Sequence, residues 1–213
     1  MKQIKILHII TRLILGGAQE NTLLTVEGLG KRKGYELTLA TGPSLGPEGS
    51  LVGEAERKGI KLIRVPGMRR EINPWRDFLT FVELYRLIKR GNYDIVHTHS
   101  SKAGILGRLA ARLAGTKVIV HTIHGLPFHE YQSRGVNYFY ILWERFAALF
   151  TDKIITVAEA MTSKALEAKL APEEKFITIY SGMELDKFLE SEVGAVDKRE
   201  QLKGRPAFPF EGT

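Results

Sequence analysis

The amino-acid sequence predicts an α/β protein with a Rossmann-like, doubly wound and mainly parallel seven-stranded sheet that carries helices on both faces. Two observations lead to this prediction. Short strand-like segments are apolar at nearly every position, which is typical of strands buried on both sides. Segments with apolar residues at helical spacing alternate with these strands. This alternation favours parallel pairing, because each helix returns the chain to the same edge of the sheet.

The amino-terminal part of the chain predicts three strands and two helices. The run IKILHII (4–10) is the first strand, and the apolar spacing of 18–31 predicts a helix after it. ELTLAT (36–41) is the second strand. A short helix over 50–58 then leads to the third strand, IKLIRV (60–65).

The middle of the chain continues the alternation. A long amphipathic helix is expected over 74–90, and Pro74 suits its first turn. DIVHTH (94–99) is a strand, 102–114 is a helix rich in Ala, Leu and Gly, and KVIVHT (117–122) is the next strand.

The last elements begin with a helix over 136–150 that is crowded with aromatic residues, whose spacing predicts burial in the core. DKIITV (152–157), a helix over 159–169 and KFITIY (175–180) complete the sheet. We therefore expect one Rossmann-like domain over residues 1–188.

Residues 189–213 break the pattern, because they are polar and interrupted by Gly and Pro without a sustained period. Two interpretations are open. The segment is a tail without a fixed structure, or it is a linker toward a further domain that this chain lacks.

The composition of the chain indicates the cellular compartment of the protein. The chain has 213 residues, of which 44% are hydrophobic, but no long uncharged apolar run that predicts a transmembrane span. The absence of cysteine excludes disulfides and thiolate metal sites, and it fits a reducing cytoplasm. We expect a cytoplasmic protein.

The net charge of +7 is most simply a solvated basic surface. An anionic ligand, an anionic membrane surface and nucleic acid are the more specific alternatives. Nucleic acid is not expected as a partner, because no basic motif interleaved with aromatics is present.

In a doubly wound sheet, ligands bind beyond the carboxyl ends of the strands, near the point where the strand order reverses. This rule selects five loops as candidate site segments: 11–18, 42–48, 66–73, 99–102 and 122–132.

Gly16 and Gly17 lie between the first strand and the first helix. Glycine lets the backbone approach a ligand closely, and the free N–H groups of a helix start favour phosphate. The pair is not a GxGxxG motif, so a plain tight turn is an equal alternative to a phosphate contact.

His97 and His99 are two apart in a strand, so their side chains point to the same face. A shared metal ion and polar packing at a strand end are the alternatives. We favour packing, because no carboxylate partners stand nearby, and we expect no metal site. Ser100 and Ser101 suit the cap of the following helix.

The segment HTIHGLPFHE (121–130) places three histidines around a Gly and a Pro. A neutral imidazole donates one hydrogen bond and accepts another, which suits both sugar hydroxyls and acid–base work. The alternative is a histidine whose hydrogen bonds are satisfied by backbone groups, and it is stronger for His121 than for His124. We expect His129 to face solvent.

Arg69 and Arg70 stand beside Met68, Ile72 and Trp75 in the loop 66–73. Cations mixed with exposed apolar side chains suit an anionic lipid surface or a phosphorylated acceptor, so peripheral contact with the inner face of a membrane is one interpretation. A solvated charged loop is the other, and it is the simpler one.

Taken together, the motifs resemble those of family 4 retaining glycosyltransferases. The resemblance covers roughly residues 4–188 and only the amino-terminal, acceptor-side domain of that family. Its motifs stand in family order: GGAQ after the first strand, HTH followed by SKAG and GRLAAR, HTIHG, DKIITVAEAM and IYSGMELDKF.

The resemblance implies one half of a GT-B fold, in which two Rossmann-like domains enclose the active site. Such enzymes move a sugar from a nucleotide-sugar to a glycan, lipid or small-molecule acceptor, with retained configuration and no divalent metal. The resemblance implies that Gly16 and Gly17 approach the donor phosphates and that His124 lies close to the transferred sugar. The loops 42–48 and 66–73 fall where acceptors bind.

Further acceptor or surface contacts are expected from five residues: Arg69, Arg70, His99, Ser100 and Lys102. No cofactor is expected besides the nucleotide-sugar substrate.

Ser181 and Ala158 depart from the Asn and Ser that are common in the family, which leaves the subgroup open. The family also binds its donor through a carboxy-terminal domain, with an Arg/Lys pair and two glutamates eight positions apart, that this sequence lacks. Alone, this chain is expected to be inactive. Two alternatives are a non-catalytic subunit that pairs with a separate donor-binding domain and a nucleotide-sugar epimerase-like GT-B protein.

Overall fold

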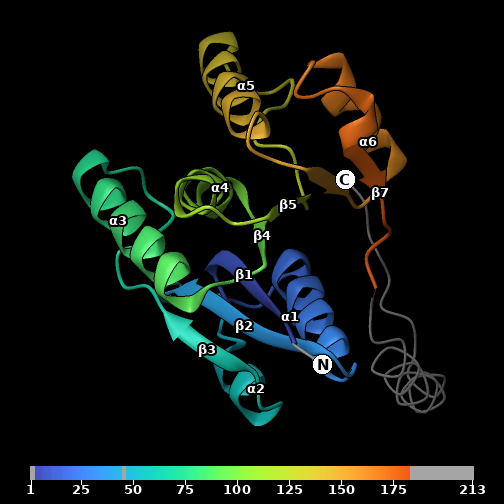
Figure 1. Cartoon of the computed structure of the whole chain (residues 1–213). Coiled ribbons are helices and arrows are strands. Elements are labelled where there is room, and N and C mark those ends of the chain that lie inside the picture. Colours follow the sequence, from blue (N-terminus) through green and yellow to red (C-terminus); the bar gives the residue numbers. More distant parts are fainter. Residues whose placement is uncertain (1–2, 45–46, 183–213) are drawn as a thin grey trace, which may run out of the picture. The chain divides into compact units, whose positions relative to one another are not determined.

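The computed structural model describes residues 3–44 and 47–182, and within these residues seven strands form one sheet in which every pair is parallel. The strand order is β3-β2-β1-β4-β5-β6-β7 (Figure 1). The strands are β1 (Ile4–Arg12), β2 (Tyr35–Gly42), β3 (Lys61–Arg64), β4 (Ile95–His99), β5 (Val118–Ile123), β6 (Lys153–Thr156) and β7 (Phe176–Thr178). The predicted α/β class and parallel sheet are confirmed.

Helices connect the strands in the predicted order and cover both faces of the sheet (Figure 1). Core residues of β1 pack with α3 and α4 on one face, and with the segment around α1 and α2 on the other. The α-helices are α1 (Gly17–Gly30), α2 (Val52–Arg57), α3 (Pro74–Gly91), α4 (Ser101–Ala114), α5 (Arg134–Ala148) and α6 (Glu159–Glu167), and a 3₁₀ turn (Glu173–Lys175) precedes β7.

The last six residues of the expected domain 1–188, and the expected tail or linker 189–213, lie outside the described residues. Among the helices that are described, none combines the length and the apolarity that crossing a membrane requires.

The strand order reverses between β1 and β4. The chain first builds outward from β1 to β2 and β3, and it then returns to place β4 on the other side of β1. In this parallel register, His8 of β1 pairs with His97 of β4, and Ile10 pairs with His99. Polar side chains from two distant parts of the sequence therefore meet at the switch point, where a ligand site is expected.

The loop after β3 packs closely over the end of β2. A Cβ atom at Gly42 would lie 1.8 Å from the carbonyl oxygen of Met68, so only glycine fits there. The Met68 side chain is fully buried, and the expectation that it adds to an exposed apolar group is wrong. Ile72 and Trp75 are exposed, as expected.

The prediction that the aromatic residues of α5 are buried in the core is wrong. Its buried residues are Glu144, Ala147 and Ala148. The aromatic side chains point outward and contact one another edge to face, as Phe139 does with Trp143. The exposed large side chains of α5 are Val136, Tyr138, Phe139, Leu142, Trp143 and Phe146.

Helix α5 turns Glu144 inward, beside Ala147 and Ala148, because α4 presents a buried cation to it. Arg108 is 0% exposed, and its Nη2 donates to Glu144 Oε2 over 2.6 Å. The guanidinium also donates to the carbonyl oxygen of Gly104 and to the hydroxyl of Thr151. A buried guanidinium without a counter-charge is very costly, so this pairing decides which side of α5 faces the domain.

We predict that Glu144→Leu lowers the free energy of unfolding by about 3–5 kcal/mol, because it leaves the Arg108 charge buried and unpaired. Urea denaturation followed by circular dichroism measures this change. The double variant Arg108→Met/Glu144→Leu removes both charges and should recover most of the loss. Equal losses in the single and double variants would show that packing volume, not charge pairing, holds α5 in place.

Candidate functional site

A pocket of about 310 Å³ opens at the carboxyl edge of the sheet. Three of the predicted loops contribute to it: Ala18 stands at the start of α1, Ser100 and Ser101 at the start of α4, and the segment 121–127 at the end of β5. Glu144 of α5 and Leu170 complete the lining. The histidine-rich segment thus lines this pocket, as the edge rule predicted.

The predicted loop 42–48 borders a second pocket of about 290 Å³, with residues 45–46 lying outside the described part. Its lining includes Pro43 and Ser44 of this loop and Arg64 at the end of β3.

Gly16 and Gly17 form the start of α1. The Gly16 carbonyl accepts hydrogen bonds from the N–H groups of Gln19 and Glu20, while no side chain caps the helix. A Cβ atom at Gly17 would meet nothing within 4 Å, so the space beside it is open. Backbone N–H groups at an open helix start are suited to an anion, and the donor-phosphate role stays a prediction.

Ser100 joins β4 to α4 in an unusual backbone conformation, with φ 63° and ψ 155°. This region costs a non-glycine residue roughly 1–3 kcal/mol. The Ser100 hydroxyl does not cap α4. It lies 2.8 Å from the Thr11 hydroxyl and donates to the His99 carbonyl. The α4 start is capped instead from β1, because Ala103 N–H donates to Thr11 Oγ1.

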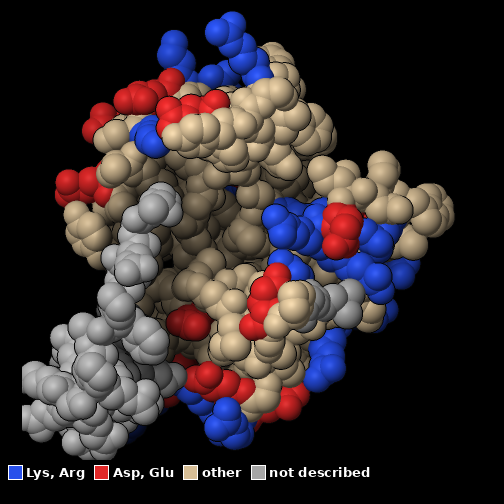
Figure 2. All heavy atoms as spheres, turned by 180° about the vertical axis from the view of Figure 1, so that it is seen from behind, with Lys and Arg blue, Asp and Glu red and all other residues tan. Residues whose placement is uncertain are grey.

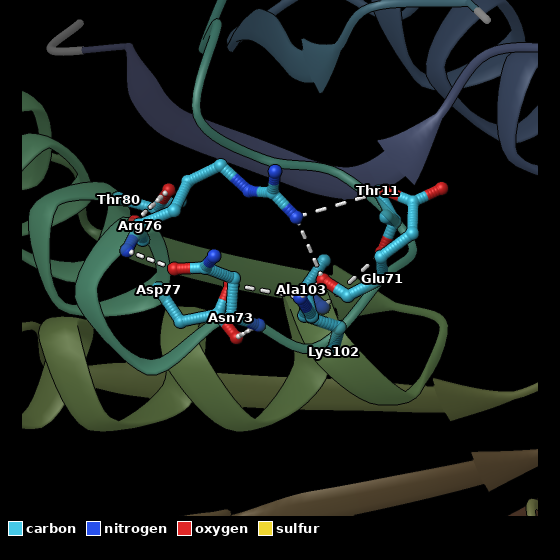
Figure 3. Close-up of polar contacts among 8 residues, drawn as sticks. All are labelled: Thr11, Glu71, Asn73, Arg76, Asp77, Thr80, Lys102 and Ala103. Atoms are coloured by element: carbon cyan, nitrogen blue, oxygen red, sulfur yellow. Dashed lines mark hydrogen bonds and ion pairs between the residues drawn. The ribbon is translucent and has the colours of Figure 1, made fainter.

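Lys102 ties the loop 66–73 to α4 (Figure 3). Its ammonium donates to Asp77 Oδ1 over 2.8 Å and to the Glu71 carbonyl, and its side chain is 14% exposed. Asp77 also accepts from the Asn73 N–H, which holds the first turn of α3 in the same network. The ammonium is thus engaged in positioning the loop, and a contact with the acceptor stays a prediction.

Arg69 and Arg70 are exposed in this loop, and their role at a surface or acceptor also stays a prediction. His99 is different, because it is 1% exposed. A side chain buried to this degree offers no surface to an acceptor in this structure.

His97 and His99 lie side by side, as the strand geometry predicted, with ring centroids 4.3 Å apart. Their neighbour His8, from β1, was missed by sequence reasoning. It is fully buried, and its Nδ1 lies 3.0 Å from Nε2 of His99. The available signal was a histidine inside an otherwise apolar strand, but only the strand order shows which residues it meets.

Nitrogen atoms of His8, His97 and His99 all lie within 4.8 Å of one another, so the described residues do contain one group with metal-ligand proximity. Polar packing also accounts for the group, since His97 Nε2 lies 2.7 Å from the Thr122 hydroxyl and His99 bonds both its ring nitrogens to other histidines. The cluster contains no carboxylate.

His124 lines the pocket, and its Nε2 lies 3.1 Å from Nδ1 of His99. Burial lowers the pKa of His124 to about 4, so the ring is neutral at pH 7. With Nε2 engaged by His99, a neutral ring has one nitrogen left for a hydrogen bond with a sugar, and it carries no positive charge.

Of the other two histidines of the segment, His121 also lines the pocket, whereas His129 does not. His121 is buried, with Nδ1 2.9 Å from the Thr98 hydroxyl, and a Cβ atom at Gly104 would come within 2.7 Å of its ring. It is satisfied structurally, although by a side chain and not by the backbone. His129 is exposed, as expected.

Comparison with known proteins gives the family context. The sequence profile of Glycosyltransferase Family 4 matches residues 15–187. An Escherichia coli protein named UDP-Gal:alpha-D-GlcNAc-diphosphoundecaprenol alpha-1,3-galactosyltransferase is 33% identical over 210 residues, which are 98% of this chain and 52% of that protein. The chain thus spans about half the length of this curated relative.

Solved structures show the same fold. A glycosyltransferase from Rickettsia africae ESF-5 matches with a TM-score of 0.68 and 20% identity, over 98% of this chain and 52% of that one. The UDP-GlcNAc 2-epimerase from Neisseria meningitidis matches with a TM-score of 0.62 and 15% identity, over 94% and 53% of the two chains. Both match one half of a GT-B structure, as expected.

We predict that the free energy of unfolding falls as the pH drops from about 6.5 toward 4. Burial holds the pKa of His8 at about 4 in the folded protein, against 6.5 when exposed, and it also lowers the pKa of His97, His99, His121 and His124. Between pH 6.5 and 4 the unfolded state binds more protons than the folded state. The free energy of unfolding therefore has its full value above pH 6.5 and falls on acidification. His8 alone contributes at most about 3 kcal/mol.

Urea denaturation at half-unit pH steps measures this dependence, and carboxylates add to it at the acid end. The variant His8→Phe isolates the contribution of His8, because its stability should fall less steeply between pH 6.5 and 4.5. Identical slopes for the variant and the wild type would contradict the assignment of a neutral, buried His8.

Proposed function

Because the chain belongs to Glycosyltransferase Family 4, we propose that it is the acceptor-side half of a retaining glycosyltransferase that moves a sugar from a nucleotide-sugar to an acceptor. The observation that carries the proposal is the pocket itself. It brings the neutral, half-buried His124 and the open start of α1 to the same edge of the sheet.

In the proposed reaction, the bond between the anomeric carbon and the nucleoside diphosphate breaks, and a bond to the acceptor hydroxyl oxygen forms on the same face of the sugar. The departing diphosphate takes up the proton that this hydroxyl loses. Negative charge develops on the departing diphosphate. The N–H groups at the start of α1, beside Gly16 and Gly17, are suited to bind it. His124 donates or accepts a hydrogen bond at a sugar hydroxyl and so orients the sugar for transfer.

We propose a lipid-linked acceptor at a membrane surface. The E. coli relative is named for galactosyl transfer from UDP-Gal to a diphosphoundecaprenol-linked sugar, which makes UDP-galactose and such a lipid the first substrates to test. Exposed Ile72 and Trp75 stand beside Arg69 and Arg70 in the loop 66–73. Apolar side chains beside cations suit an anionic lipid surface.

Helix α3 extends this basic surface (Figure 2). Figure 2 shows Lys and Arg side chains gathered on the flank of the molecule on which α3 lies. The exposed cations of α3 and the preceding loop are Arg69, Arg70, Arg86, Lys89 and Arg90.

We further propose that donor binding is completed by a second domain, on the same polypeptide or on a separate subunit. In the second case this chain is a binding subunit. An epimerase activity has less support, since the Neisseria enzyme shares only the fold with this chain at 15% identity.

In the complete enzyme we predict that His124→Ala lowers kcat/KM roughly 10²–10³-fold, the usual effect of losing one hydrogen-bonding group that is oriented toward the transition state. Transfer from UDP-galactose to a lipid-diphosphate acceptor is the assay. His129→Ala is the matched control, because His129 lies five residues away in the same segment and is exposed. Comparable activities for the two variants would exclude His124 from the sugar site.

We predict that the double variant Arg69→Glu/Arg70→Glu loses most of its binding to vesicles that contain anionic lipid, since each cation near the surface contributes about 1 kcal/mol. Cosedimentation with vesicles of mixed neutral and anionic phospholipid measures binding. The control is Arg32→Glu/Lys33→Glu, an exposed basic pair in the turn before β2, which changes the net charge by the same amount. Equal losses in both variants would reduce the effect to net charge.

A further inference from the structure

His8, His99 and His124 form a hydrogen-bonded row, called the histidine row below. Nδ1 of His8 lies 3.0 Å from Nε2 of His99, and Nδ1 of His99 lies 3.1 Å from Nε2 of His124. His8 and His99 are 0% and 1% exposed, whereas His124 reaches the pocket. The row therefore runs from the buried middle of β1, through the end of β4, to the predicted sugar-binding residue.

Each ring of the row is neutral. Burial lowers the pKa of all three side chains, and the neighbouring histidines lower that of His99 further. A neutral imidazole has one N–H and one lone pair. Both hydrogen bonds of the row can then form only if every N–H points the same way, so the three rings must share one tautomer.

The buried end of the row decides the direction. Nε2 of His8 is buried without a hydrogen-bond partner among the described residues. If the rings were protonated at Nε2, this end would be an N–H group with no acceptor, which folded proteins rarely tolerate. Protonation at Nδ1 leaves only a lone pair unpaired there. It makes the His99 Nδ1–H group the donor to His124, and it leaves the Nδ1–H group of His124, a residue that lines the pocket, outside the row.

We infer that His99, supported by His8, is a positioning residue that fixes His124 in its Nδ1–H tautomer, so that His124 presents a hydrogen-bond donor to an oxygen atom of the bound sugar. The inference deepens the proposed function and rests on it for the identity of the ligand. His97 supports the row from the side, because its ring lies against His99 and its Nε2 is held by Thr122.

A metal ion held by His8, His97 and His99 is the competing use of the same atoms. Three neutral imidazoles would leave its double positive charge uncompensated in a buried position. In the Nδ1–H tautomer, the lone pair on His99 Nε2 that such an ion needs is engaged with His8. The hydrogen-bonded row therefore accounts for the cluster better than a metal site does.

The test is ¹⁵N NMR of the histidine side chains in the 213-residue chain at pH 7, with His124→Asn used to assign the His124 signals. In the wild type we expect protonated Nδ1 and unprotonated Nε2 for His124, together with a ¹⁵N–¹⁵N coupling across the hydrogen bond to His99. His99→Leu should abolish the coupling and leave His124 in the tautomer mixture that the exposed His129 shows. His99→Asn keeps an amide donor close to the position of Nδ1 and should restore the Nδ1–H form.

A wild-type His124 protonated at Nε2, or averaged between tautomers, overturns the inference without any variant, so a failure of His99→Leu to fold does not protect it. Stoichiometric zinc in protein purified without chelator, with loss of the N–H signals of the row, overturns it in favour of the metal site. The measurement is also independent of catalysis. If His124→Ala left sugar transfer intact, the proposed role at the sugar would fail while the tautomer result stood.

Discussion

The buried ion pair between Arg108 and Glu144 determines how the second half of the domain is assembled. Its guanidinium, 0% exposed, bonds to groups on α4, on α5 and at Thr151 beyond α5. Arginine cannot escape burial by losing its proton, so its partners must be built into the fold. Glu144 supplies the charge and also forms part of the pocket wall. The pocket and the docking of α5 thus depend on one interaction.

The same desolvation acts differently on the histidines. Histidine can give up its proton, so burial neutralises His8, His97, His99 and His121 and requires no counter-ion. Neutral rings can then bond to one another and to threonine hydroxyl groups. Within residues 3–44 and 47–182, the domain therefore contains one buried cation with a dedicated carboxylate and a group of polar rings without charge. The rings near the pocket are oriented by hydrogen bonds that this chain supplies by itself.

The sequence was sufficient for the fold, because strand runs such as IKILHII are apolar throughout and helical spacing separates them. The rule for strand ends correctly placed three of the five selected loops at the pocket. The sequence did not reveal that His8 belongs to the histidine cluster. The neighbours of His8 depend on the strand order β2-β1-β4, which is a property of the assembled sheet. The prediction that the aromatic residues of α5 are buried was also wrong, because periodicity identifies an apolar face but not whether that face is covered. The inward side was decided by Arg108, which lies 36 residues from Glu144 in sequence.

The charges around the pocket support a division of labour between two domains. Among the described lining residues the charged one is Glu144, which is paired with Arg108, and the lining histidines are neutral. A diphosphate bound there would meet the start of α1, which is equivalent to roughly half a positive charge, and no lysine or arginine of the described lining. Most of its charge must be compensated by cations from outside this pocket. We therefore expect this chain to orient the sugar, and the donor-binding domain to supply the positive charge for the leaving group.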